Sequence, residues 1–289
     1  MAEPAASPTA PADAVIAAAR AGEPDRYLAA LLAPPSARAG LLALAAFASE
    51  VGRVPFLVTR EPAMGEIRLQ WWRDALASSD EPARTGNRVA DALRDAVVHH
   101  NLSRELLLDV IEARAADVSR DAIADDAGLR AYLWKSEGAL FALAGHVLCA
   151  DPRLDLHAPA AACGHAYGLT RLLLGLPQAL SHGRLALPRT RLDAAGVMPQ
   201  ELLAGDGGDK AVPLLADLHA EARRSVVTSR QRVANLPRKV RVAFLPLALV
   251  ESYLRALERP GRDVLRQPAD IAPLTRVARI AAAHWLGRF

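Results

Sequence analysis

Long stretches of helical periodicity, interrupted by prolines, limit most strongly what this chain can fold into. Apolar residues recur every three or four positions, and the alternation typical of β-strands is rare. The clearest stretches are residues 36–54, 63–78, 87–100, 129–150, 159–181, 212–235 and 240–258. We predict an all-α fold of about ten helices without strands, arranged as one bundle around a packed core or a central cavity.

Composition agrees with a helical bundle. Alanine and leucine, two strong helix formers, dominate the chain, which is 52% hydrophobic and only 4% aromatic. The 289 residues are enough for one large domain, which we place at residues 13–289. The first twelve residues are small and proline-rich and lack the regions of a signal peptide, so we expect a disordered lead-in.

The charges argue against a nucleic-acid partner. The 35 basic and 32 acidic residues nearly cancel, leaving a net charge of +3.

No apolar run reaches the ~18–20 residues of a spanning helix. Cys149 and Cys163 are interpreted as core residues in a reducing compartment. We therefore expect a cytoplasmic protein, at most peripheral on the inner face of a membrane.

The tail at residues 273–289 is basic and amphipathic. It carries Val277, Ile280 and Trp285 on one side and Arg276 and Arg279 nearer the other. Such a helix can lie in a membrane interface or dock on the bundle. We favour docking, because its apolar face is narrow and rich in alanine.

An aspartate-rich stretch resembles a metal motif but sits in a polar connection between helices. Asp121, Asp125 and Asp126 have the D-x-x-x-D-D spacing, and we expect them to cap helices or lie in a loop. The chain also lacks the phosphate-loop, dinucleotide-binding, zinc-protease and serine-hydrolase motifs.

The segment at residues 170–188, TRLLLGLPQALSHGRLALP, carries the most specific motif. It resembles the T-N-I-L-R-D-x-x-E-D-x-x-x-G-R-x-Y-L-P segment of the squalene/phytoene synthase family. The matching residues are Thr170, Leu173, Gly183, Arg184, Leu187 and Pro188. The resemblance implies two aspartates four positions apart, where this chain has Gly175 and Ala179.

A second segment, from Leu44, is similar to the family's Y-A-F-C-R-x-x-D-D-x-x-D motif. Ala46 and Phe47 keep the frame, whereas Gly52, Arg53 and Phe56 occupy the positions of the three aspartates. In the family these carboxylates hold the Mg²⁺ that ionises a prenyl diphosphate. Magnesium takes oxygen ligands, so the substitutions remove the expected donors.

Two further segments extend the resemblance over roughly residues 27–263. These are LLDVIEARAADV, which retains Asp117, and YLWKSEGALFALAGHVL. The stretch GEIRLQWWRDAL at residues 65–76 is most similar to a divergent branch of the family, which includes a mitochondrial assembly factor for respiratory complex I. The resemblance implies an isoprenoid-synthase fold without prenyl transfer.

Three functions therefore stand as hypotheses. The first is a degenerate family member without catalytic residues or a bound metal, which assists assembly of a membrane respiratory complex, NADH dehydrogenase. The second is an Mg²⁺-dependent head-to-head prenyltransferase that uses other acids, with Glu50, Glu66 and Asp117 as candidates and Glu66 facing the cavity. The third is a protein that binds a polyprenyl lipid without chemistry.

Some residues are candidates for lining a cavity or for binding an anion: Arg68, Trp72, Tyr132, Lys135 and Arg184. On residues 63–78 the apolar positions Met64, Ile67, Trp71 and Ala75 step by three and four, which predicts that this face is buried. Trp71 should then be a core residue, and Trp72 should line a groove or interface.

Overall fold

The computed structural model describes residues 11–58, 61–77, 84–120, 122–149, 151, 153–205 and 208–287. Residues 1–10 of the expected lead-in, and Asp121, lie outside this part of the chain. The first helix begins at Pro11, so residues 11 and 12 belong to it.

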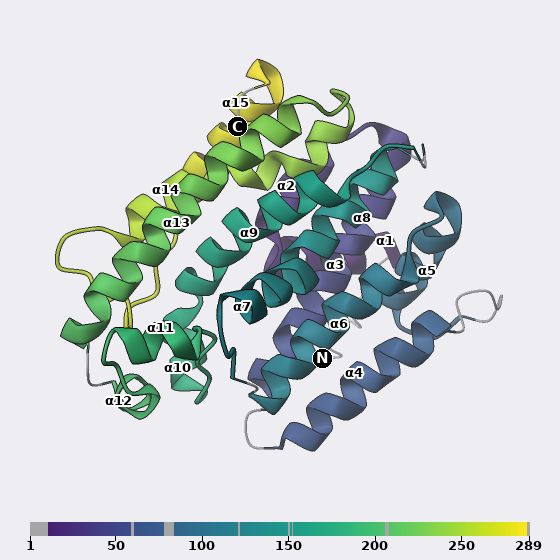
Figure 1. Cartoon of the computed structure of the whole chain (residues 1–289). Helices are drawn as coiled ribbons and strands as arrows, with labels where there is room; N and C mark the ends of the chain where they lie inside the picture. The colour runs from purple at the N-terminus through teal and green to yellow at the C-terminus, as the bar shows by residue number, and fades with distance from the viewer. Residues whose placement is uncertain are drawn as a thin grey trace, which may run out of the picture.

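The described residues form helices and connections and contain no strand, as predicted (Figure 1). The α-helices are α1 (Pro11–Gly22), α2 (Pro24–Leu31), α3 (Pro35–Leu57), α4 (Pro62–Ala77), α5 (Arg88–His100), α6 (Arg104–Ser119), α7 (Asp126–Leu133), α8 (Ala139–Leu148), α9 (His157–Leu174), α10 (Leu176–Ser181), α11 (Arg189–Ala194), α12 (Pro199–Ala204), α13 (Gly208–Ala234), α14 (Val250–Leu257) and α15 (Pro273–Leu286). A π-helical turn, η1 (Trp134–Gly138), joins α7 to α8, and a 3-10 helix, η2 (Val240–Leu249), precedes α14.

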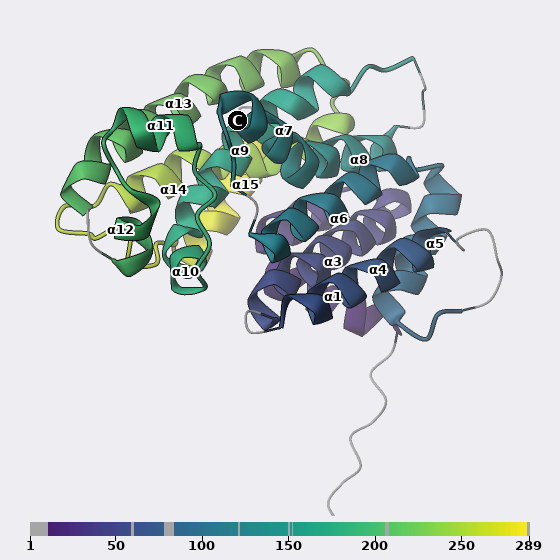
Figure 2. The same ribbon diagram turned by 60° about the horizontal axis from the view of Figure 1, so that its bottom comes forward.

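Helix α3 forms the centre of the N-terminal half and packs against α1, α5, α6 and α8 (Figure 2). By length and composition α3 could cross a membrane, which the sequence analysis missed. However, 72% of its apolar window is buried inside the bundle, as expected of a core helix. In the C-terminal half, α13 runs along α9, and α15 packs on η2 (Figure 1).

Several helix boundaries follow from the sequence. Asn87 and Ser103 cap α5 and α6 by accepting hydrogen bonds from backbone N–H groups of the first turn. Asp125 caps α7 in the same way, and Asp126 pairs with Arg191, so neither belongs to a metal cluster. The stretch at residues 159–181 is divided near Pro177, with α9 ending before Gly175 and α10 beginning after it.

Other boundaries differ from the prediction. Helix α3 begins at Pro35 and continues through Pro55 to Leu57, beyond the stretch expected at residues 36–54. The single helix expected at residues 129–150 is divided by η1, and α11 lies outside the stretches in which helical periodicity is clearest. Two of these differences bear on the site. The π turn shifts the register of the side chains that follow, and the extension of α3 places Phe56 on a helix that lines the cavity.

The buried face of α4 is not the one that its spacing suggested. Leu69, Trp72 and Leu76 point into the bundle, whereas Met64 and Ile67 are exposed. Trp72 is 4% exposed and packs edge-on against Phe47, whereas Trp71 is 39% exposed. The prediction failed because both stripes of α4 carry apolar residues, so periodicity alone could not choose between them.

Candidate functional site

A cavity of about 310 Å³ opens between the two halves of the bundle. Its walls come from α3, α6, α9, α10 and the continuous stretch from α7 to η1. Charged side chains on these walls are four arginines, at 53, 114, 171 and 184, and three carboxylates, at 23, 117 and 137. The volume is near the lower end of the range of small-molecule pockets.

The rim of the cavity carries the positions that the family resemblance singled out: Gly52, Arg53, Phe56, Gly175 and Ala179. We call these five residues the cavity rim. Helix α3 contributes the first three and the α9–α10 junction the last two, so the two segments face one cavity. Arg53 is 60% exposed and lies 4.0 Å from Glu50. None of the rim residues offers a carboxylate.

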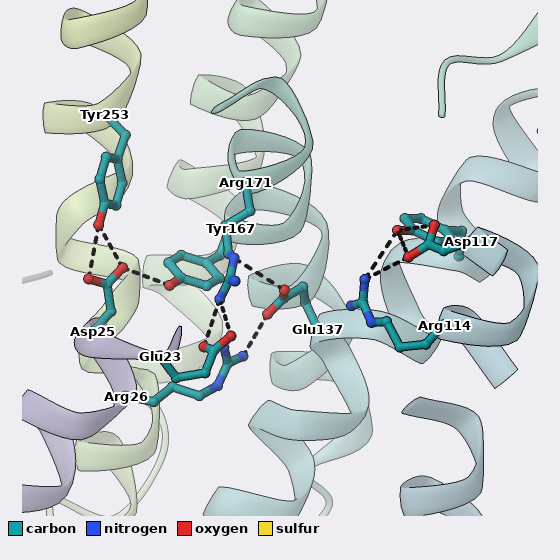
Figure 3. Close-up of polar contacts among 10 residues, drawn as sticks. Glu23, Asp25, Arg26, Arg114, Asp117, Glu137, Tyr167, Arg171 and Tyr253 are labelled. Atoms are coloured by element: carbon teal, nitrogen blue, oxygen red, sulfur yellow. Dashed lines mark hydrogen bonds and ion pairs between the residues drawn. The ribbon is translucent and has the colours of Figure 1, made fainter. Parts of the chain in front are cut away.

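Deeper in the wall lies a closed set of ion pairs, here called the inner cluster: Glu23, Arg26, Glu137 and Arg171 (Figure 3). Arg26 donates to Glu23 at 2.8 Å and to Glu137 at 2.7 Å. Arg171 donates to both oxygens of Glu23 at 2.7 Å, and its Nε lies 3.5 Å from Glu137. The cluster ties the start of α2 to η1 and α9.

Electrostatics within the inner cluster favours the charged forms. Burial alone would raise the pKa of Glu23, but the guanidiniums of Arg171 and Arg26 outweigh burial and hold that pKa below its ordinary value. Burial would also lower the pKa of Arg26, yet Glu137 and Glu23 raise it above the usual range. Both acids of the cluster are therefore neutralised by arginine.

Asp117 is enclosed by a second group. Arg114 donates to it at 2.9 Å, the Tyr132 hydroxyl donates at 3.1 Å, and Arg184 forms an ion pair with it. Burial, followed by the charge of Asp117, raises the pKa of Tyr132 to about 12, so this phenol stays protonated. Arg184 also lies 5.2 Å from the ring centroid of Phe56, which connects this group to the rim.

A third buried group joins the two ends of the chain without lining the cavity. The hydroxyls of Tyr167 and Tyr253 donate to Asp25 at 2.7 and 2.8 Å, and Arg276 of α15 lies 2.8 Å from the same carboxylate. Figure 3 shows Asp25 on one side of the inner cluster and Asp117 on the other. Helix α15 is thus docked on the bundle, the favoured alternative for the tail.

Of the residues proposed from sequence as cavity or anion ligands, only Tyr132 and Arg184 line the cavity. Lys135 points away from it and pairs with Glu112 and Asp109 of α6. Arg68 and Trp72 instead line a separate groove between α3 and α4. The incorrect placement of Arg68 follows from the mistaken buried face of α4.

The candidate acids do not converge either. Asp117 lines the cavity, whereas Glu50 lines the groove between α3 and α4. Glu66 is exposed, 4.0 Å from Arg73, so the expectation that it faces the cavity was wrong. The described residues contain no group of three or more His, Cys, Asp or Glu side chains arranged to hold a metal.

This donor set does not fit magnesium. A Mg²⁺ site needs several oxygen ligands in nearly octahedral geometry with carboxylates free to face the metal. Here each carboxylate in the cavity is bonded to arginine, and the rim presents glycine, alanine, phenylalanine and arginine. Arginines outnumber carboxylates, so the lining would repel a divalent cation.

Sequence reasoning missed Glu23, Arg26, Glu137 and Arg171. A usable signal was present for Arg171, which stands among leucines of α9 at residues 169–174. A charge in such a position must be paired when it is buried. The sequence does not reveal which charges pair, because Glu23 and Arg171 are 148 positions apart.

Comparison with known proteins agrees with this architecture. The family model described as squalene/phytoene synthase matches residues 19–276. The chain belongs to the squalene/phytoene synthase family.

Two relatives carry a more particular description. The chain is 28% identical over 259 residues to the NADH dehydrogenase (ubiquinone) complex I assembly factor 6 of Rattus norvegicus, covering 87% of this chain and 76% of that protein. It is 27% identical over 256 residues to the Homo sapiens protein of the same name, covering 86% and 75%.

Solved structures of family members share the fold. Squalene synthase HpnC from Alicyclobacillus acidocaldarius superimposes with a TM-score of 0.72 at 19% identity, covering 87% of this chain and 94% of that one. A dehydrosqualene synthase in complex with ligand gives a TM-score of 0.79 at 17% identity and 94% coverage of both chains. Together they identify the isoprenoid-synthase fold.

Proposed function

We propose that this protein is a non-catalytic family member that assists the assembly of a membrane respiratory complex, NADH dehydrogenase. The observation that carries the proposal is that the cavity lacks carboxylates positioned to bind a metal. Carboxylates are missing at all five rim positions, and the three that remain in the lining are neutralised by arginine. Similarity to the assembly factors supports the choice of partner.

Deleting the gene tests the assembly role. We expect loss of assembled NADH dehydrogenase activity in membranes, with recovery when the wild-type gene is returned. Succinate dehydrogenase activity, measured in the same membranes, controls for a general membrane defect. Normal assembled NADH dehydrogenase in the deletion strain would count decisively against the role.

Prenyl transfer is the alternative, and its test is direct. Purified protein with Mg²⁺ and farnesyl or geranylgeranyl diphosphate should release no diphosphate above a blank, because each carboxylate that the described residues place in the cavity lining is paired with arginine. A dehydrosqualene synthase assayed in parallel verifies the conditions. Release by this protein that disappears in Asp117→Asn, but persists in Glu66→Gln, would revive the enzyme hypothesis with Asp117 as its acid.

A passive lipid-binding function makes a different prediction. The cavity has apolar lining at Ala48, Val110 and Leu140 beside its charges, so a polyprenyl lipid would have to co-purify with the folded protein. Extraction and mass spectrometry measure this, and we expect none because ion pairs occupy the deep wall.

For location, we propose the cytoplasmic side of the inner membrane. Helix α15 supports this, because docking through Ile280 and Ala283 leaves Leu274, Trp285 and Leu286 exposed. Exposed aromatic and aliphatic residues near arginine are typical of an interfacial contact. Separation of membrane and soluble fractions measures it, with salt extraction distinguishing a peripheral attachment.

A further inference from the structure

A groove between α3 and α4, outside the cavity, has exposed apolar side chains in its lining. Its volume is about 380 Å³, and its apolar lining consists of Val54, Leu57, Ile67, Trp71 and Trp72. Leu57 is 62% exposed and Ile67 is 61% exposed. Contiguous exposed apolar side chains rimmed by polar residues are typical of an interaction site.

The fold explains why none of the described residues covers this face. Helix α4 lies at the edge of the molecule and packs its inner stripe, with Leu69 and Leu76, against α6 (Figure 1). Ile67 and Trp71 lie one turn apart on the outer stripe. Met64, one turn before Ile67, extends the stripe and is also exposed.

The rim of the groove is positively charged. Its charged lining residues are Arg53, Arg68 and Glu50. Arg53 is held only loosely, 4.0 Å from Glu50. Arg68 is exposed and forms no hydrogen bond or ion pair with other residues in the part of the chain that the structure describes. Tryptophan and arginine beside aliphatic residues are the composition of energetically important interface centres.

We propose that this groove binds an amphipathic helix of a protein partner, with aliphatic residues facing Ile67 and Trp71 and carboxylates facing Arg53 and Arg68. A concave seam between two helices accepts the ridge of a third helix. The two arginines in its lining favour glutamate or aspartate over lysine on that helix. The inference deepens the proposed function, on which it rests, because an assembly factor must hold a segment of its client.

A designed peptide tests the groove without any knowledge of the client. The probe is a fluorescent 18-residue helix with leucine along one face and glutamate on both flanks, and the comparison peptide has lysine in place of glutamate. By fluorescence anisotropy we expect the glutamate peptide to bind about tenfold more tightly, the effect of two exposed charge contacts. Arg68→Glu should reduce that preference.

Matched variants locate the site. Ile67→Glu should abolish peptide binding, whereas Val227→Glu, which changes a 55% exposed residue on α13, should leave it unchanged. Both substitutions are on exposed helix surface, so melting temperatures should match the wild type. Failure of the glutamate peptide to bind, or equal binding by both variants, overturns the proposal.

The same variants in the deletion strain identify the natural occupant. Ile67→Glu should fail to restore assembled NADH dehydrogenase, and Val227→Glu should restore it. A photo-crosslinking residue at position 67 should capture a different protein; capture of a second copy of this chain or of lipid overturns the proposal. A deletion strain without a defect would reject the assembly role alone, because the peptide measurement still decides the groove.

Discussion

The cavity rim and the inner cluster differ in the charged side chains that they contain. At the rim, the positions expected to hold metal ligands carry Gly52, Arg53, Phe56, Gly175 and Ala179. Deeper in the cavity, the inner cluster contains Glu23 and Glu137, and each of them forms ion pairs with arginine. Carboxylates are therefore present in the described cavity lining where a guanidinium neutralises them, and they are missing from the rim positions where a metal would have to do so.

Breaking one inner ion pair should have the largest effect on stability. Arg26→Met leaves Glu137 with only the longer contact to Arg171, and we expect a loss of about 3–5 kcal/mol in the free energy of unfolding. Arg53→Met at the rim should change it by no more than about 0.5 kcal/mol. Urea denaturation measures both.

A double variant sharpens this first prediction. Arg26→Met with Glu137→Leu removes both partners of a pair, so no isolated charge stays buried, and most of the lost stability should return. If Arg26→Met and Arg53→Met destabilise equally, the contrast between rim and inner cluster is wrong.

Replacing glycine by alanine should lower the stability of the fold next to the inner cluster and raise it at the cavity rim. A Cβ at Gly164 would lie 2.5 Å from the Cα of Gly138 in the π turn, so Gly164→Ala must push α9 away from η1. We expect a loss of about 1–3 kcal/mol. At Gly52 a Cβ meets nothing within 4 Å, and Gly52→Ala should gain about 0.5–1 kcal/mol from helix propensity. Thermal denaturation measures both; a loss in Gly52→Ala would show that the rim is packed after all.

The helices and the altered rim could be predicted from the sequence, because each depends on local information. Asn87 and Ser103 are of residue types that favour helix starts, and both cap helices in the structure. The rim residues stand at fixed positions within two motifs. The inner cluster could not be predicted, because its pairing depends on how α2 meets η1 and α9. The groove was missed for another reason: Ile67 and Leu69 are both apolar, and only packing on α6 decides which is buried.

Acid titration should separate two buried carboxylates that lie two residues apart. The arginines give Glu23 a pKa below its ordinary value of 4.5, so its contribution to stability is present above that pH and is lost as the pH falls. Burial raises the pKa of Asp25 despite its hydrogen bonds from Tyr167 and Tyr253. The contribution of Asp25 to stability therefore increases as the pH falls.

The measurement is the unfolding free energy of each variant from pH 7 to pH 3. The stability advantage of wild type over Glu23→Gln should shrink as the pH falls, and that over Asp25→Asn should grow. Parallel curves for the two variants would show that proximity to Arg26 and Arg171 does not distinguish these sites.

Addition of metal should have the smallest effect of all. A ligand that binds only the folded state at 100 times its dissociation constant stabilises by about 2.7 kcal/mol, which raises the melting temperature of a chain this size by several degrees. The cavity lining has more arginines than carboxylates. The melting temperature in Mg²⁺ with inorganic diphosphate should therefore equal that in EDTA with the same diphosphate. Diphosphate in EDTA is the necessary control, because four arginines can attract the anion without a metal. A rise that requires Mg²⁺ would mean that oxygen ligands converge in this cavity after all, and the distinction between rim and inner cluster would lose its functional meaning.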